Sequence, residues 1–82
     1  MEEQQQKKQR MMGAVQKVIG PAGYGFIKAD SGEAVFFHLK NLRGYRDKQT
    51  ELPREGAVVR FTRLPQNVEG KLARAIDVEV LG

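Results

Sequence analysis

Aromatic side chains occur at every second position in two short apolar segments of this 82-residue chain. The first segment has Tyr24 and Phe26 on either side of a glycine, and the second has Phe36 and His38 on either side of a phenylalanine. Because side chains alternate between the two faces of a β-strand, each pair is expected on one face of its strand. Flat rings at this spacing are suited to stacking against other flat π-systems.

The two aromatic segments, 24–29 and 33–39, are predicted to pair as a β-hairpin. An Asp-Ser-Gly turn joins them, and both segments are rich in apolar and aromatic residues. If Ile27, Val35 and Phe37 form part of a core, the four rings lie together on the outer face of neighbouring strands.

Exposed rings on an outer sheet face reduce solubility unless something covers them. The bases of a single-stranded nucleic acid are a natural cover, since stacking on an aromatic side chain stabilises each base by about 1–3 kcal/mol. The alternative is that the rings pack under a loop, the N-terminal tail or a partner chain. Four rings at period 2, with Lys and Arg around them, favour the nucleic-acid interpretation.

The remaining chain predicts more strands and no firm helix. Apolar and polar residues alternate in three further segments: 13–19, 57–64 and 71–81. Helical spacing is also present in the last of these, but its Val-rich end and the sheet edge that a helix would leave open favour a strand. A helical turn within 39–50 is compatible with the pattern. We therefore predict an all-β, five-stranded antiparallel barrel of the OB type.

The domain organisation follows from polarity and length. Residues 1–11 are almost entirely polar and are expected to form a disordered tail, whereas residues 12–82 are expected to form one domain. The net charge is +4 and the isoelectric point is near 9.7, which favours polyanionic partners. Charge alone fits an ordinary soluble basic domain equally well.

Several classes of chemistry find no support in the composition. Cysteine is absent, which excludes disulfides and Cys-ligated zinc, and the single histidine is a poor metal site by itself. His38 has no Ser or Cys at catalytic spacing, so we expect no enzyme, no cofactor and no small-molecule substrate. No apolar run is long enough for a bilayer or a secretory signal, so we expect a cytoplasmic protein without a membrane partner. We also expect a monomer or a weak dimer.

The motifs occur in an order that resembles a known family. The chain contains GAVQKVI at 13–19, GYGFI at 23–27 and VFFH at 35–38, followed by a Val-rich and an Ala-rich segment. In this order, the five segments resemble the bacterial cold-shock domain. The resemblance covers about residues 13–80. It implies a cold-shock-like, five-stranded OB-type barrel that binds single-stranded RNA or DNA, with a role such as RNA chaperoning. It also implies that four residues stack bases: Tyr24, Phe26, Phe36 and His38.

The chain departs from the family at positions that matter for binding. Ala22 stands where the family usually has Lys, Lys17-Val18 stands where it usually has a Trp-Phe pair, and Leu39 replaces an aromatic after the second motif. Strict alternation from Val15 turns Lys17 inward. The bent first strand of the family implies instead that Lys17 points outward, toward a phosphate or a base.

Basic residues around the rings are the candidates for phosphate contacts. The candidate set comprises Lys17, Lys28, Arg43, Arg46 and Arg74, with Tyr45 in the place of the family's loop aromatic. The loop members fit a solvated loop without specific contacts equally well. The alternative function is a protein-interaction module of the OB type, since loss of family aromatics is what drift away from base stacking produces.

Overall fold

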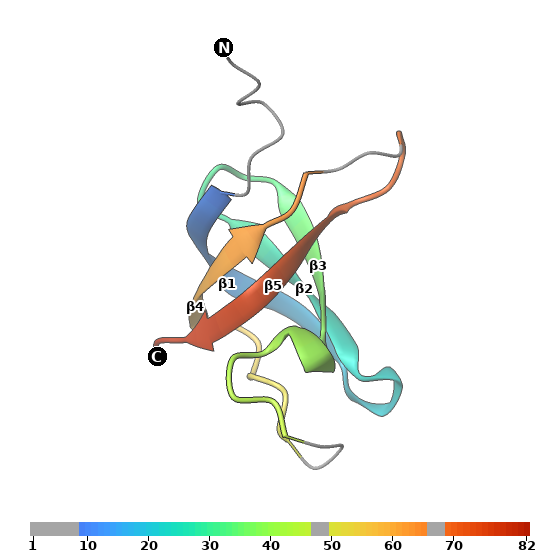
Figure 1. Ribbon diagram of the computed structural model, residues 1–82, viewed down its shortest axis with the longest axis vertical. Helices are drawn as coiled ribbons and strands as arrows, with labels where there is room; N and C mark the ends of the chain where they lie inside the picture. Colours follow the sequence, from blue (N-terminus) through green and yellow to red (C-terminus); the bar gives the residue numbers. More distant parts are fainter. Residues whose placement is uncertain (1–8, 47–49, 66–68) are drawn as a thin grey trace.

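In the part of the chain that the structure describes, the short segments form five strands and two single 3₁₀ turns. The computed structural model describes residues 9–46, 50–65 and 69–82. In chain order the elements are β1 (Gln9–Ile19), η2 (Gly20–Ala22), β2 (Tyr24–Ala29), β3 (Ala34–His38), η3 (Leu39–Asn41), β4 (Val58–Arg63) and β5 (Ala73–Val80). The all-β prediction is confirmed, as are the hairpin of β2 and β3 and the strand at the C-terminal segment (Figure 1).

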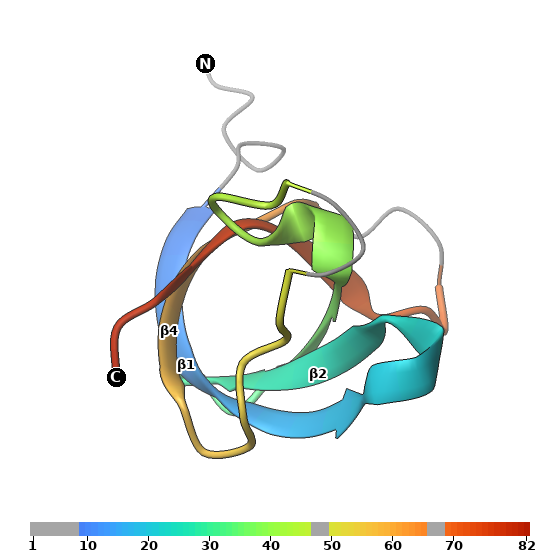
Figure 2. The same cartoon turned by 90° about the horizontal axis from the view of Figure 1, so that it is seen from below.

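The strands close into a barrel in the order β1-β2-β3-β5-β4, with β4 also paired to β1. Figure 2 looks into the barrel from one end and shows the strands as a ring. The predicted antiparallel sheet is wrong at one pair, because β3 and β5 run parallel. Strand direction cannot alternate around a closed ring with an odd number of strands, so one parallel pair is required.

β1 is the longest strand because it serves two partners. Residues 9–14 pair with β4, and residues 13–19 pair with β2. Gly13 lies in both ladders, and a Cβ there would lie 2.5 Å from the carbonyl oxygen of Lys28, so the strand bends where it has no side chain. β1 begins at Gln9, three residues before the expected domain boundary at residue 12. The predicted disorder of residues 1–8 lies outside the described residues.

The barrel encloses a small apolar core. The predicted core residues Ile27, Val35 and Phe37 are fully buried, which confirms the assignment of strand faces. The other buried apolar residues are Val15, Ala29, Leu42, Ala57, Val59, Phe61, Ala73, Ala75 and Val78. All polar and charged side chains among the described residues are at least partly exposed. The chemistry of the molecule therefore lies on its surface.

One end of the barrel is covered by the long connection between β3 and β4. The described parts of this connection, including η3 and residues 50–57, run across the end of the ring in Figure 2. Leu42 is buried in the core, and Leu39 and Leu52 pack against it. The described residues include no helix that is both long and apolar enough to cross a membrane.

Candidate functional site

Three of the predicted stacking residues form one ring cluster on β2 and β3. The ring centroids of Tyr24 and Phe26 are 5.9 Å apart, those of Tyr24 and Phe36 are 5.4 Å apart, and those of Phe26 and Phe36 are 6.0 Å apart. His38 lies directly opposite Tyr24 in the β-ladder. All four side chains are half-buried, so each keeps an accessible edge or face. We call these four residues the aromatic platform.

Gly25 allows β1 and β2 to approach closely beneath the platform. A Cβ at this position would lie 2.6 Å from the carbonyl oxygen of Lys17 and 2.9 Å from the ring of Phe37. Contacts this short do not occur for real Cβ atoms, so glycine is required here. The platform residues Tyr24 and Phe26 are thereby held on a strand that lies tightly over the core.

A β-bulge places Lys17 on the outer face. Val15 pairs with Ile27 and Lys17 pairs with Phe26, so Gln16 is an extra residue in β1. The extra residue reverses the inward orientation that strict alternation gives to Lys17. Lys17 is exposed and lies opposite Phe26 of the platform. The resemblance predicts this outward orientation, whereas strict alternation along β1 predicts an inward one.

Hydrogen bonds at the start of η3 fix the orientation of His38. The Asn41 side-chain oxygen accepts from the His38 backbone N–H at 2.9 Å, and the Lys40 backbone N–H donates to His38 Nδ1 at 3.1 Å. Since Nδ1 accepts, the ring carries its proton on Nε2, and this N–H remains to donate to another group. The Asn41 amide NH₂ likewise remains available as a donor, because the bond from the His38 backbone N–H uses only the Asn41 side-chain oxygen.

The parallel pairing of β3 and β5 brings Arg74 to the platform. Arg74 lies opposite Phe36 in the ladder and is exposed. A hollow of about 320 Å³ is lined by Phe26, Phe36, Lys71, Leu72 and Arg74. A second hollow, of about 300 Å³, is lined by Phe36, His38, Lys40, Asn41 and Arg74. The two hollows share Phe36 and Arg74, so the platform continues onto β5.

Four residues that line these hollows were absent from the predicted site: Lys40, Asn41, Lys71 and Leu72. Leu72 is 49% exposed and lies just before the last strand, which begins at Ala73 and not at residue 71 as the alternation predicts. No pattern in the sequence pairs this segment with β3. The candidate Lys28 lies on the same face of β2 as Phe26, one step further along, and is exposed.

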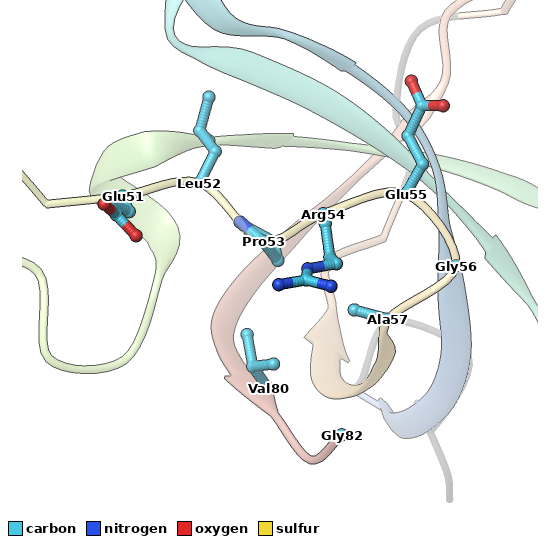
Figure 3. A pocket seen from close by; sticks show the side chains of 9 residues that line it. All are labelled: Glu51, Leu52, Pro53, Arg54, Glu55, Gly56, Ala57, Val80 and Gly82. Atoms are coloured by element: carbon cyan, nitrogen blue, oxygen red, sulfur yellow. The ribbon is translucent and has the colours of Figure 1, made fainter.

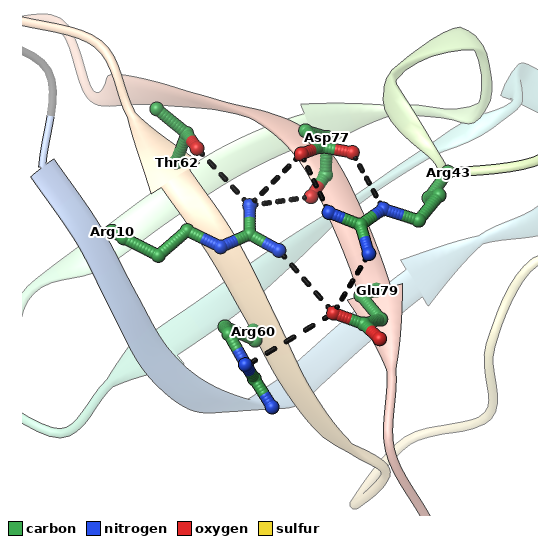
Figure 4. Close-up of polar contacts among 6 residues, drawn as sticks. All are labelled: Arg10, Arg43, Arg60, Thr62, Asp77 and Glu79. Carbon is green, nitrogen blue, oxygen red and sulfur yellow. Dashed lines mark hydrogen bonds and ion pairs between the residues drawn. The ribbon is translucent and has the colours of Figure 1, made fainter.

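Arg43 is held by acidic residues of β5, away from the rings. Its guanidinium donates to both carboxylate oxygens of Asp77 at 2.9 Å and lies 3.1 Å from Glu79. Arg10 of β1 joins the same two acids, and also donates to the Asp77 carbonyl oxygen and to Thr62 (Figure 4). This network spans β1, β4 and β5.

Asp77 is the centre of this network, and its backbone is unusual. It has a φ of 51°, in the left-handed region that Asp tolerates better than most residues. The hydrogen bonds from Arg43, together with the charges of Arg43 and Arg10, hold the pKa of the Asp77 carboxyl below its ordinary value despite slight desolvation. The network ties the segment after η3 to the barrel wall.

The loop candidates Tyr45 and Arg46 make their described backbone hydrogen bonds within the connection that follows η3. Their backbone N–H groups bond to the Leu42 carbonyl oxygen and to the Thr50 hydroxyl. Neither side chain has a ring contact or a hydrogen bond with a platform residue among residues 9–46, 50–65 and 69–82. The structure thus brings six of the ten predicted site residues together, namely the four platform residues with Lys17 and Arg74. Lys28 lies further along β2 on the same face, and Arg43, Tyr45 and Arg46 belong to the segment after η3.

A second ion pair lies near the turn between β2 and β3. Arg63 donates to both oxygens of Glu33, at 2.8 and 2.9 Å. These hydrogen bonds hold the pKa of the Glu33 carboxyl below its ordinary value, although partial burial acts in the opposite direction. The pair joins the end of β4 to the turn that leads into β3.

A larger hollow, of about 700 Å³, lies at the covered end of the barrel (Figure 3). It is lined by residues 51–57, Val80 and Gly82, and the Arg54 side chain extends across it. It contains no predicted site residue. In the described part of the chain, His, Asp and Glu side chains form no group of three that would suit a metal ion.

No protein-family model matches this chain, and no curated protein matches it. The site must therefore be interpreted from its own geometry.

Proposed function

We propose that this protein is a divergent cold-shock-like domain of the OB type that binds single-stranded RNA or DNA. The fold supports this assignment, because β4, β1, β2 and β3 lie side by side in the order of a Greek key. A five-stranded Greek-key barrel is the OB architecture, and such barrels bind oligonucleotides on their strand faces. The motif order in the sequence supports the same assignment.

The aromatic platform is the observation that carries the proposal. Three rings lie within 6.0 Å of one another on adjacent strands, and none is fully buried. Bases stack on such rings whatever their identity, because every base has a π-face. Lys17, Lys28 and Arg74 lie beside the rings and supply positive charge for the phosphates.

The proposed activity is binding and not catalysis. His38, the residue best suited to proton transfer, uses Nδ1 to accept the Lys40 N–H, and it therefore acts in the site as a ring and an N–H donor. The absence of cysteine suits the reducing cytoplasm, where we place the protein. Neither a cofactor nor a small-molecule substrate is part of the proposal.

The test is a fluorescence titration with oligo-dT and oligo-U of about eight nucleotides, a length within the range that one OB fold covers. We expect Phe36→Ala and Tyr24→Ala each to weaken binding about 5- to 150-fold, which corresponds to the loss of one stacked base. Met12→Ala is the matched control, since Met12 is 41% exposed and pairs with Arg60 on the β4 side of β1. Urea unfolding of each variant separates loss of the site from loss of the fold.

The absence of oligonucleotide binding by the wild-type protein at low salt would overturn the proposal. It would favour the alternative that the platform binds another protein. Equal affinities of Phe36→Ala, Tyr24→Ala and Met12→Ala would also contradict the proposal, because binding would then occur elsewhere on the surface.

A further inference from the structure

Three exposed apolar side chains lie together where β5 ends and β4 begins. In the described part of the chain, five large apolar side chains are at least 40% exposed: Met12, Val58, Leu72, Val80 and Leu81. Leu72 lines a hollow beside the platform, and Met12 lies on β1. The other three are adjacent, because the Leu81 N–H donates to the Val58 carbonyl oxygen at 2.7 Å and Val80 precedes Leu81. We call Val58, Val80 and Leu81 the β4–β5 patch.

Backbone hydrogen bonds fix the β4–β5 patch in place. The Val58 N–H donates to the Gly82 carbonyl oxygen at 2.9 Å, so both backbone groups of Val58 are bonded to the residues that follow β5. Val59, the next residue of β4, is fully buried, so Val58 points away from the core. A surface that is already ordered loses little conformational entropy when it binds a partner.

The patch lies between the ion-pair network and the hollow at the covered end of the barrel. Along β4, Arg60 of the network lies two residues after Val58, and the hollow-lining segment 51–57 lies before it. β5 is antiparallel to β4 and has the same order, from Glu79 in the network to Gly82 at the hollow. The outer surface of both strands therefore passes from network to patch to hollow.

The two sides of the patch carry opposite net charges. The network has three cations against two acids, a net charge of +1: Arg10, Arg43, Arg60, Asp77 and Glu79. The hollow has two acids against one cation, a net charge of −1: Glu51, Glu55 and Arg54. Arg60 is 47% exposed and only loosely held, with its Nε 4.0 Å from Glu79. Glu51 is exposed and has no ion pair or hydrogen bond with the residues that the structure describes.

A second copy of this chain fits such a surface better than a partner of uniform charge. A two-fold axis through the patch packs patch on patch and brings the positive side of each copy against the negative side of the other. The N-terminal residues 1–8, MEEQQQKK, are a poor cover for the patch, since Met1 is their only apolar residue.

We propose that this protein forms a weak, two-fold symmetric dimer through the β4–β5 patch, with Arg60 of each copy over the acidic hollow of the other. The dimer goes beyond the proposed function. It leaves the platform of each copy open, because β4 lies across the ring of strands from the β2–β3 hairpin. An interface centred on three apolar residues is smaller than a standard one of about 1,600 Å², so we expect association weaker than micromolar.

Sedimentation velocity without nucleic acid, from about 10 µM to 1 mM protein, tests the proposal. The wild-type protein should change from monomer to dimer over this range and form nothing larger. Leu81→Ser and Val80→Ser should each raise the dissociation constant about 10-fold or more, because each removes apolar contact area from both copies. Leu72→Ser is the matched control, since Leu72 is 49% exposed and lies outside the patch. Urea unfolding checks that each variant retains the fold.

Charge reversal tests the two-fold arrangement. Arg60→Glu and Glu51→Arg should each weaken the dimer, because each places like charges against one another across the axis. The double variant restores opposite charges at both ends and should recover the association of the wild-type protein.

The proposal is supported by a dimer that both patch variants weaken, that Leu72→Ser leaves unchanged and that the double charge variant recovers. A monomer at every concentration, or equal weakening by Leu72→Ser, would overturn it. Species larger than a dimer would indicate head-to-tail contacts and would also overturn it, as would a double charge variant as weak as the single ones. Since no nucleic acid is present, these outcomes are independent of the proposed function.

Discussion

The carbonyl oxygen of Lys17 lies 2.6 Å from the point that a Cβ at Gly25 would occupy. The two residues belong to adjacent strands, just beyond the bulge that turns the Lys17 side chain outward. The ring of Phe37 approaches the same point from the core side, at 2.9 Å. Because Gly25 has no side chain, the core ring of Phe37 and the β1 backbone next to the bulge can both pack closely against β2 beneath the platform.

Gly25→Ala is expected to destabilise the barrel by about 1–3 kcal/mol, the usual cost of overpacking a filled interior. The groups that this Cβ would meet are a backbone oxygen and a packed ring, so neither yields easily. Gly20→Ala is the control, because no atom lies within 4 Å of a Cβ at Gly20 and its φ is not positive. Urea unfolding measures both, and equal stability of the two variants would contradict the assigned packing.

The hairpin and the platform were predictable because they depend on local alternation. Ile27, Val35 and Phe37 point into the core and the rings point outward, as a period of two requires. The orientation of Lys17 was not predictable in this way. A bulge adds one residue to one strand, and the sequence of β1 has no glycine at the bulge to reveal it.

The contribution of β5 was the least predictable part of the site. The sequence predicts Arg74 as a phosphate contact, but the hollow beside it depends on the parallel pairing of β5 with β3, which joins distant segments. The same holds for Arg43, whose charge suggested a ligand contact. Its partners Asp77 and Glu79 lie far along the chain, and charge alone does not reveal such pairs.

Asn41 is expected to stabilise the end of β3 and to shape the hollow beside it. Asn41→Ala removes the acceptor of the partly buried His38 N–H, which should cost about 1–3 kcal/mol in urea unfolding. Asn41→Asp retains an acceptor oxygen, so its stability should remain near that of the wild-type protein.

Asn41→Asp should nevertheless weaken binding of oligo-dT. It places a negative charge in the hollow formed by Phe36, His38 and Arg74, where a nucleic acid would bring its phosphates. Unchanged affinity of this variant would show that the ligand does not enter the hollow. Stability as low as that of Asn41→Ala would show that the cap needs the amide group.

Arg43 is expected to act on stability and not on binding. Arg43→Ala removes the pairs with Asp77 and Glu79 and should lower the thermal midpoint of unfolding. Arg46→Ala removes the same charge from an exposed side chain and is the matched control. The two variants should bind oligo-dT with equal affinity. A larger loss of affinity for Arg43→Ala would mean that its guanidinium leaves the acids to contact the ligand.

The lowered pKa values of two carboxyl groups predict how the stability of the fold depends on pH. Hydrogen bonds from Arg63 lower the pKa of Glu33, and hydrogen bonds from Arg43 lower that of Asp77. A carboxyl whose pKa is lower in the folded protein than in the unfolded chain stabilises the fold above its ordinary pKa, near 4. That stabilisation is lost as the pH falls through the folded-state pKa, when the carboxylate takes up a proton.

Glu33→Gln and Asp77→Asn therefore test this dependence by thermal unfolding between about pH 7 and pH 2. Each variant should be less stable than the wild-type protein at neutral pH, by up to about 1 kcal/mol for the half-buried Glu33 pair. Each difference should shrink below about pH 4, because the wild-type carboxyls are then becoming neutral too. Asn tolerates the positive φ of residue 77 as Asp does, so Asp77→Asn changes the charge without adding backbone strain. A difference from the wild-type protein that stays constant down to pH 2 would show that the ion pairs are not its cause.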